Sequence, residues 1–189
     1  MGHMASQEFE ALYRGDRDPW GYETSPYERD KYAATLAACG PGPFGQALEL
    51  GGSIGVFTAQ LAPRCQRLVS VDAAPTAVEA ARARVRDLHH IEIRLGSVPA
   101  DIPRRTYDLV VASEILYYLM APALEGTLAL LAEQMNPGAR LVAVHWRPAG
   151  PERPFTADQV HALLCRQRWL RHVGDADTAD YRLDILERR

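Results

Sequence analysis

Two segments between positions 47 and 72 carry the residue types from which a nucleoside site can be built. An apolar run ends in Glu49, and Gly51 and Gly55 follow it ahead of a helical pattern. The next apolar run ends on Asp72, seventeen residues after Gly55. Glycines let the backbone approach a ligand closely, and a carboxylate at the tip of the following strand accepts hydrogen bonds from a ribose diol. The spacing therefore predicts a site for a nucleoside-containing cofactor.

The spacing of the glycines distinguishes between two kinds of cofactor. A dinucleotide site requires G-x-G-x-x-G so that pyrophosphate can lie on the helix N-terminus, but Ser53 and Val56 occupy the second and third glycine positions. The pattern Glu-x-Gly-x-x-x-Gly instead resembles motif I of the S-adenosylmethionine (SAM)-dependent methyltransferases, whose cofactor carries no phosphate. Ser53 suits this turn if its backbone angles stay ordinary, and the adjoining Gly52 and Ala73 are assigned to the cofactor site. The alternative is a plain strand–helix turn, with Asp72 capping the next helix.

Polar side chains near the ends of two later apolar runs have the types needed to handle a proton. Ser113 and Glu114 follow the fourth run, and Tyr118 lies four residues after Glu114. His145 closes the fifth run, whereas His161 lies in a helical pattern and is given no role. The ligand crevice of a doubly wound sheet lies off the carboxyl ends of its strands. We therefore expect Glu114 or His145 to accept or orient a proton and Tyr118 to hold the second substrate, with Ser113 beside the cofactor. The alternatives are a helix-end role for Glu114 and a hydrogen bond to a neighbouring loop for His145.

The segment 18–36 is dense in aromatic side chains and is the candidate lid over the cofactor. Tyr27, Lys31 and Tyr32 fall at helical spacing, so one helix face would present them together. Aromatic faces suit a sulfonium cation, which assigns Trp20, Tyr27 and Tyr32 to the cofactor site. The alternative is that these rings pack the helix onto the sheet. Residues 1–6 look like an expression scar, 7–38 are expected to form a helical lid segment, and 39–189 the SAM-binding domain.

The elements that must position these residues follow from the alternation of short apolar runs and helical patterns, which predicts a parallel, doubly wound α/β sheet. The runs cover residues 46–50, 68–71, 91–95, 109–112 and 141–145. Helices are expected over 76–88 and 122–135, the second closed by a stop signal at 136–138 ahead of the fifth strand. Thr156 and Gln159 form a capping box for a helix that ends near residue 165. The runs 169–173 and 181–187 flank a polar turn over 174–180 and are expected to pair antiparallel.

Composition restricts the class of protein. At 189 residues, with 47% hydrophobic and 24% charged residues, the chain is expected to be one globular domain. A net charge of −3 without a basic cluster argues against nucleic acid or an anionic membrane as the main partner. Three scattered cysteines give neither a metal-ligand spacing nor a disulfide framework, and no apolar stretch has the length of a membrane span. We expect a reduced, cytoplasmic protein without a metal and with a small-molecule partner.

The chain also resembles one family of small SAM methyltransferases, nodulation protein S and its relatives. The most specific blocks are Asp18-Pro19-Trp20, Lys31-Tyr32 and His145-Trp146-Arg147. The resemblance spans about residues 18–188 and implies a Rossmann-like class I fold, with a mostly parallel seven-stranded sheet and a C-terminal antiparallel strand. That family N-methylates the deacetylated, non-reducing glucosamine of a chito-oligosaccharide. The resemblance therefore implies a small-molecule methyltransferase that acts on an amine or amino sugar.

Two positions depart from the pattern of related enzymes. Many methyltransferases carry an aspartate, which binds the adenine amino group, where this chain has Ser97. A serine hydroxyl accepts such a bond less strongly than a carboxylate, and a simple loop role is the alternative. Related enzymes often carry a histidine where this chain has Tyr118.

The expected reaction is a direct displacement, in which a lone pair of the acceptor attacks the sulfonium methyl group in line and leaves S-adenosylhomocysteine (SAH). The methyl donor is already activated, so the protein mainly aligns and desolvates the reactants. A hydroxyl acceptor would need a stronger base than the chain displays, which favours nitrogen. Three alternatives remain at this point: O-methylation of a sugar or other small molecule, a nicotinamide-dependent oxidoreductase, and a catalytically silent SAM-binding protein.

Overall fold

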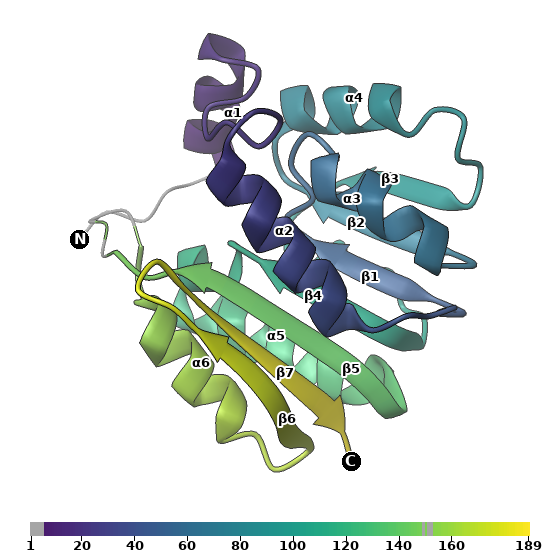
Figure 1. The fold of residues 1–189 in the computed structure, drawn as a ribbon, viewed down its shortest axis with the longest axis vertical. Helices are drawn as coiled ribbons and strands as arrows, with labels where there is room; N and C mark the ends of the chain where they lie inside the picture. The colour runs from purple at the N-terminus through teal and green to yellow at the C-terminus, as the bar shows by residue number, and fades with distance from the viewer. Residues whose placement is uncertain (1–5, 149, 151–152) are drawn as a thin grey trace.

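The computed structural model describes residues 6–148, 150 and 153–189 as a mixed sheet covered by helices (Figure 1). The strands are β1 (Ala47–Leu50), β2 (Leu68–Asp72), β3 (Ile91–Leu95), β4 (Tyr107–Ser113), β5 (Met135–Trp146), β6 (Leu170–Asp177) and β7 (Tyr181–Arg188). The helices are α1 (Ser6–Gly15), α2 (Pro26–Cys39), α3 (Val56–Leu61), α4 (Pro75–Arg84), α5 (Ala121–Gln134) and α6 (Ala157–Cys165), with short helical turns η1 (Ala62–Arg64) and η2 (Leu116–Tyr118). Residues 1–5 of the predicted expression scar lie outside the described residues, whereas Ser6 begins α1.

The sheet confirms the predicted topology. Its seven strands lie in the order β3-β2-β1-β4-β5-β7-β6, and the order reverses between β1 and β4. The strands β1 to β5 pair in parallel, while β7 pairs antiparallel with both β5 and β6. This is the doubly wound arrangement, in which a ligand crevice forms off the carboxyl ends of the strands at the reversal point. The seven strands and the antiparallel β7 match the Rossmann-like arrangement expected from the sequence.

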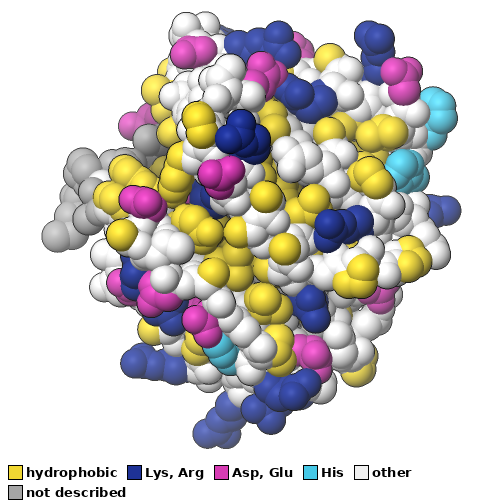
Figure 2. All heavy atoms as spheres, in the orientation of Figure 1, with side chains coloured by type: hydrophobic (Ala, Val, Ile, Leu, Met, Phe, Trp, Pro, Cys, Tyr) yellow, Lys and Arg dark blue, Asp and Glu magenta, His cyan; other side chains and the backbone are white. Residues whose placement is uncertain are grey.

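Side-chain alternation along the central strands creates a core on each face of the sheet. Leu48 and Leu50 of β1 face one way and pack in a cluster with residues of α5 and α6. Ala47 faces the other way, in a cluster with residues of α2 and α3. In Figure 1, α2 and α3 lie in front of the sheet and α5 lies behind it. Figure 2, in the same orientation, shows hydrophobic side chains over the middle of this face, with acidic and basic side chains mixed around them.

The largest differences from the predicted element boundaries lie in β5, β6 and α4. The residues 136–138, predicted as a stop ahead of the fifth strand, lie inside β5, because Met135 already pairs with Tyr107 before the register shifts. Asn136 donates its side-chain amide to Asp108 Oδ1 at 2.8 Å, which holds this irregular stretch against β4. Strand β6 continues to Asp177, so the acidic segment predicted as a turn is largely strand. Helix α4 ends at Arg84, four residues earlier than predicted.

The predicted capping box is confirmed, and α1 docks onto α4 by capping the first turn of that helix. Thr156 accepts from the Gln159 backbone N–H, and the Gln159 side chain accepts from the Thr156 backbone. Glu10 of α1 accepts the backbone N–H of Thr76 at 2.9 Å and its hydroxyl at 2.8 Å. A carboxylate there satisfies an otherwise unpaired N–H in the first turn of α4 and complements the helix dipole. None of the helices among the described residues is long and apolar enough to cross a membrane.

Candidate functional site

A cavity of about 460 Å³ lies at the carboxyl ends of the parallel strands, beneath α1 and the start of α2. Its volume falls in the range of small-molecule sites. Figure 1 shows these N-terminal helices near the arrowheads of β2 and β4. The predicted site residues that line the cavity are Trp20, Tyr27, Gly51, Asp72, Ala73, Ser97, Ser113, Glu114 and Tyr118. The predicted residues Glu49, Gly52, Gly55, Tyr32 and His145 are not part of its lining.

The Asp72 carboxylate holds the glycine-rich turn from the end of β2. Its two oxygens accept the backbone N–H groups of Ser53 at 2.8 Å and Ala74 at 2.9 Å. Burial raises the pKa of Asp72, and these N–H donors oppose that effect. A carboxylate offers about four acceptor positions, so roughly two remain for hydroxyl groups of a ligand. Gly51 has φ +74°, and a Cβ at this position would lie 3.2 Å from Ile115 Cβ, so glycine is required.

From the sequence, Ser53 is expected to suit the turn if its backbone angles are ordinary, and the structure shows that they are not. Ser53 has φ +51°, in the left-handed region that disfavours side chains. Its N–H is held by Asp72, and its hydroxyl makes a short contact with the Tyr13 hydroxyl of α1. These two contacts stabilise the strained turn, and the second one ties α1 directly to it.

Glu49, Gly52 and Gly55 support the turn from outside the cavity. Glu49 is 3% exposed and accepts from the Thr58 hydroxyl at 2.5 Å, and burial raises the pKa of its carboxyl to about 7. A Cβ at Gly52 would lie 1.8 Å from Ser70 Oγ, and one at Gly55 would lie 3.0 Å from Ala81 Cα. Motif I therefore combines residues that line the cavity with residues that let the surrounding elements approach closely.

Ser97 lies in the cavity wall on the loop after β3. Its backbone N–H donates to Asp101 Oδ2 at 2.7 Å, which fixes the loop. The role of its hydroxyl toward adenine stays a prediction.

A buried cluster of charges forms the wall at the start of α2. The Lys31 ammonium donates to Glu28 Oε1 at 3.0 Å and to Glu114 Oε1 at 2.7 Å. Burial alone would lower the pKa of Lys31, but the carboxylates of Glu114 and Glu28 raise it above its ordinary value. Two carboxylates surround one ammonium, so the fully ionised cluster carries one net negative charge.

The two carboxylates of this cluster differ in how many partners they have. Glu114 Oε2 accepts the Trp146 backbone N–H at 2.9 Å and the Tyr117 hydroxyl, so both oxygens of Glu114 are occupied. Glu28 Oε2 is buried and has no hydrogen-bond partner among the described residues, and the same holds for the Tyr27 hydroxyl. Burial raises the pKa of Glu28. Buried polar atoms are nearly always satisfied, so these two are candidates for contact with a ligand.

Aromatic rings enclose the rest of the cavity. The Tyr118 ring lies 4.5 Å from that of Tyr117 and meets Phe9 of α1 edge-on at 5.0 Å. The Arg153 guanidinium lies 4.7 Å from the centre of the Tyr117 ring. Tyr32 instead packs on Phe57 of α3 at 5.4 Å, which agrees with the packing alternative for that residue.

The structure corrects the expectation that His145 lines the acceptor pocket. His145 is fully buried, and both ring nitrogens are bonded within the protein. Nε2 accepts the Leu116 backbone N–H at 3.2 Å, and Nδ1 lies 3.0 Å from Nε2 of His161. His161, to which no role was assigned, is also fully buried. Neither ring is in a position to take a proton from a molecule in the cavity.

The expectations from sequence also left out several residues that line the cavity. Phe9 and Tyr13 come from α1, Glu28 from α2, and Arg153 from the loop after β5. The i, i+4 spacing of the two α1 aromatics is a signal that identifies a buried helix face. Glu28 and Lys31, three residues apart on one face, have the spacing of an ion pair, although sequence alone gives no sign of its burial.

Comparisons with known proteins agree on one family. The sequence model of the family Nodulation protein S (NodS) matches residues 7–147. Nodulation protein S of Rhizobium tropici is 37% identical over 176 residues, which cover 86% of this chain and 72% of the relative. That of Bradyrhizobium diazoefficiens is 38% identical over 125 residues, covering 61% of this chain and 58% of the relative. The crystal structure of the N-methyltransferase NodS from Bradyrhizobium japonicum WM9, in complex with SAH, matches with a TM-score of 0.87 at 27% identity and covers 97% of both chains.

Proposed function

Because this chain belongs to the nodulation protein S (NodS) family, we propose that it transfers a methyl group from SAM to the nitrogen of a small-molecule amine. It is a SAM-dependent methyltransferase of the class I fold. The acceptor class that we propose is an amino sugar with a free amino group. The cytoplasmic location and the exclusion of nucleic acid as a substrate belong to the same proposal.

The residues of the cavity fit SAM. Asp72 retains acceptor positions for the ribose hydroxyls, since each of its oxygens takes one backbone N–H. Gly51 brings the backbone to the cavity wall without a side chain. The rings of Trp20 and Tyr27 lie in the same wall and suit a sulfonium cation. When bound, SAM supplies a methyl group on a positively charged sulfur, so the protein mainly aligns and desolvates the reactants.

The observation that carries the amine proposal is the carboxylate of Glu28, a residue that lines the cavity and whose buried Oε2 has no hydrogen-bond partner among the described residues. An attacking amine has N–H groups to donate and must lose a proton in the course of the reaction. Glu28 Oε2 accepts such an N–H and then holds the proton, and its raised pKa suits a general base. The net negative charge of the Glu28–Lys31–Glu114 cluster favours a cationic or N–H-rich group beside it.

Glu114 acts in this proposal as the residue that orders the cluster. Its carboxylate fixes the Lys31 ammonium, the Tyr117 hydroxyl and the backbone of Trp146. Lys31 in turn orients Glu28 so that Oε1 is occupied and Oε2 is not. The free base is thus Glu28, and the expected role of Tyr118 in holding the acceptor stays a part of the proposal.

The proposal is tested by SAH formation with glucosamine oligomers and with their fully N-acetylated counterparts. We expect turnover with the free amines and none with the acetylated sugars. Glu28→Gln removes the base while keeping the shape, so kcat/KM should fall by about 10²-fold or more, with SAH affinity within about twofold of the wild type. Glu79→Gln, on the exposed side of α4, is the matched control and should behave as the wild type.

Three results would contradict the proposal. Equal turnover of free and acetylated sugars would identify oxygen as the target. Unchanged kinetics in Glu28→Gln would remove Glu28 from the mechanism. Tight SAH binding without turnover on any amine would point to a SAM-binding protein without catalysis.

A further inference from the structure

A chain of buried polar side chains leads from the acceptor side of the cavity to β7, the strand next to the edge of the sheet. It begins at the backbone N–H of Leu116 in η2 and continues through His145 of β5 and His161 of α6 to Asp184 of β7. Its links measure 3.2, 3.0 and 2.6 Å, and the side chains of its last three members are at most 1% exposed. The reaction proposed above uses none of these three side chains.

The hydrogen bonds assign one tautomer to each imidazole. The Leu116 N–H donates to His145 Nε2, so the proton of this ring lies on Nδ1, which donates to His161 Nε2. His161 therefore carries its proton on Nδ1 and donates it to Asp184 Oδ2. Burial and the neighbouring His161 lower the pKa of His145 well below its ordinary value, so this ring stays neutral.

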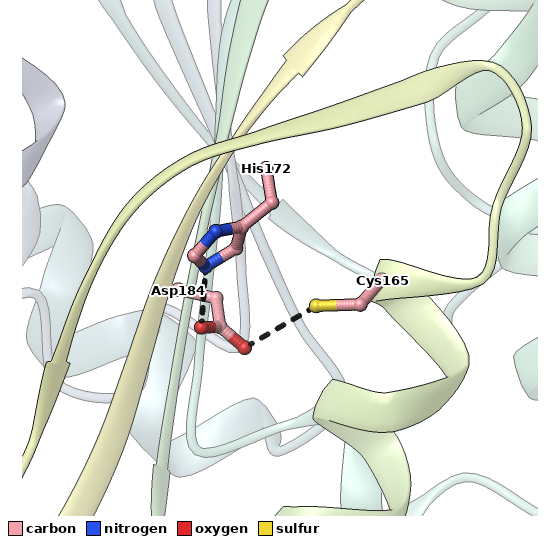
Figure 3. Close-up of side chains that lie close together, drawn as sticks. All are labelled: Cys165, His172 and Asp184. Atoms are coloured by element: carbon pink, nitrogen blue, oxygen red, sulfur yellow. Dashed lines mark hydrogen bonds and ion pairs between the residues drawn. The ribbon is translucent and has the colours of Figure 1, made fainter.

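Asp184 anchors the outer end of the chain. Besides His161, the carboxylate accepts His172 Nε2 at 3.0 Å and Arg182 Nε at 3.3 Å. Cys165 Sγ lies 3.8 Å from it, and Figure 3 shows Asp184 between His172 and Cys165. Burial alone would raise the pKa of Asp184, but the bonds from His161 and His172 and the charge of Arg182 lower it below its ordinary value. Asp184 is thus an ionised acceptor at neutral pH, and it fixes the direction of every bond in the chain.

Cys165, His172 and Asp184 are also side chains of the kinds that bind zinc, and their ligand atoms lie within 4.8 Å of one another. Both carboxylate oxygens, however, already accept N–H donors, and the Arg182 guanidinium contributes a positive charge beside them. A cation would have to displace these donors. The cluster in Figure 3 therefore acts as the anchor of the chain rather than as a cation site.

The inner end of the chain holds the wall of the acceptor half. Leu116 begins η2, which also carries Tyr117 and Tyr118 of the cavity lining. The His145 ring packs edge-on against the Tyr117 ring at 4.9 Å, and the Tyr117 hydroxyl donates to Glu114. A change in the tautomer or position of His145 would therefore alter the positions of Tyr117 and Glu114, which order Glu28.

We infer that His145, His161 and Asp184 are positioning residues, which hold η2 and thereby set the acceptor half of the site. The ionised carboxylate of Asp184 fixes the tautomers of His161 and His145. As a result, Nε2 of His145 has no proton and accepts the Leu116 N–H at the other end of the chain. The assignment of η2 to the acceptor half rests on the proposed function, whereas the hydrogen bonds from Leu116 to Asp184 are independent of it.

The first measurement is the tautomer of each ring in the ¹⁵N-labelled wild type, by long-range ¹H–¹⁵N NMR at pH 7. We expect His145 and His161 both to be neutral and protonated on Nδ1. A proton on Nε2 of His145 would overturn the inference, because that nitrogen could not then accept the Leu116 N–H. This measurement needs no variant and no turnover.

The second measurement compares two variants at position 145 by amide hydrogen exchange. His145→Phe keeps a ring but removes the acceptor, whereas His145→Gln keeps an acceptor oxygen near the position of Nε2. We expect exchange in 116–118 to rise about tenfold in the Phe variant, the scale of one lost buried hydrogen bond, and to return toward the wild-type rate in the Gln variant.

A purely structural role would give a different pattern. It would raise exchange throughout the core in both variants, including residues 51–56 and 72–74 of the cofactor half, and it would lower SAH affinity. Confinement of the effect to η2, with SAH affinity within about twofold of the wild type, supports positioning. Equal exchange of 116–118 in the Phe and Gln variants would overturn it. Neither result depends on which acceptor the enzyme uses.

Discussion

Replacement of Asp72 by alanine is the most direct test of the cofactor half of the site. The carboxylate lines the cavity and accepts the backbone N–H groups of Ser53 and Ala74 at 2.8 and 2.9 Å. Asp72→Ala removes the proposed acceptor for the ribose hydroxyls and leaves both N–H groups without their partner. We expect SAH affinity to fall by about tenfold to a hundredfold, which corresponds to roughly 1.4–2.8 kcal/mol for one or two charge-assisted bonds.

The same change should appear as a smaller thermal shift with SAH. At a ligand concentration of about 100 Kd, binding stabilises the folded wild type by about 2.7 kcal/mol. For a domain of this length that raises Tm by roughly 5–11 °C. A tenfold loss of affinity at the same ligand concentration leaves about 1.4 kcal/mol, or roughly 3–6 °C. Without ligand, the free energy of unfolding of the variant should also be lower by roughly 1–3 kcal/mol, because two N–H groups lose their acceptor.

Calorimetry with SAH gives the affinity directly, and a thermal melt checks the fold of the variant. The matched control is Asp87→Ala, since the Asp87 side chain is 88% exposed and pairs with Arg86 at the surface. It should leave SAH affinity unchanged. A folded Asp72→Ala protein that binds SAH within about twofold of the wild type would refute the assignment of Asp72 to the ribose.

Two further predictions concern the lid and the buried carboxyl of motif I. Glu10→Ala removes the cap on Thr76 that docks α1, so amide exchange in 6–15 should rise about fivefold, the scale of a lost cap of about 1 kcal/mol. Unchanged exchange relative to the exposed control Glu79→Ala would refute this docking. The pKa of Glu49 is raised to about 7, so the folded state binds more protons there than the unfolded state and stability should fall by up to about 3 kcal/mol as pH rises from about 4.5 to 7. Glu49→Gln keeps an acceptor for Thr58 and should flatten this part of the profile in chemical denaturation, whereas an equally steep fall would exclude Glu49 as its cause.

The sheet and the place of the motif I residues around the cavity could be predicted because both depend on order along the chain. The run from Glu49 to Gly55 and the carboxylate at Asp72 need a strand, a turn and the next strand, and parallel pairing then brings the two strand ends together. The residues that line the cavity at this end are accordingly those of the motif, with Glu49, Gly52 and Gly55 behind them. Their supporting role follows from close packing that the spacing alone does not reveal.

The acceptor half was less predictable because it depends on the face to which a side chain points. His145 lies near the end of β5 as expected, but it shares a strand face with Leu141 and Ala143, which pack against α5 and α6. It therefore points into that core and not to the cavity. The Glu28–Lys31–Glu114 contact joins residues 83 positions apart in sequence. Only the docking of α2 on the end of β4 brings them together, and periodicity within one helix carries no information about that docking.

Backbone strain links the two halves of the site. Apart from glycines, Ser53 and Glu114 are the described residues with positive φ, at +51° and +56°, and both line the cavity. Such conformations cost about 1–3 kcal/mol each and persist where the surroundings hold them. Ser53 is held by Asp72 and Tyr13, and Glu114 by Lys31, Tyr117 and the Trp146 backbone. In each case a residue of the N-terminal helices supplies one of the contacts, so docking of that segment and correct geometry of the turns stabilise each other. The N-terminal segment therefore contributes to the cavity on both sides, through Tyr13 at the glycine-rich turn and Lys31 at Glu114.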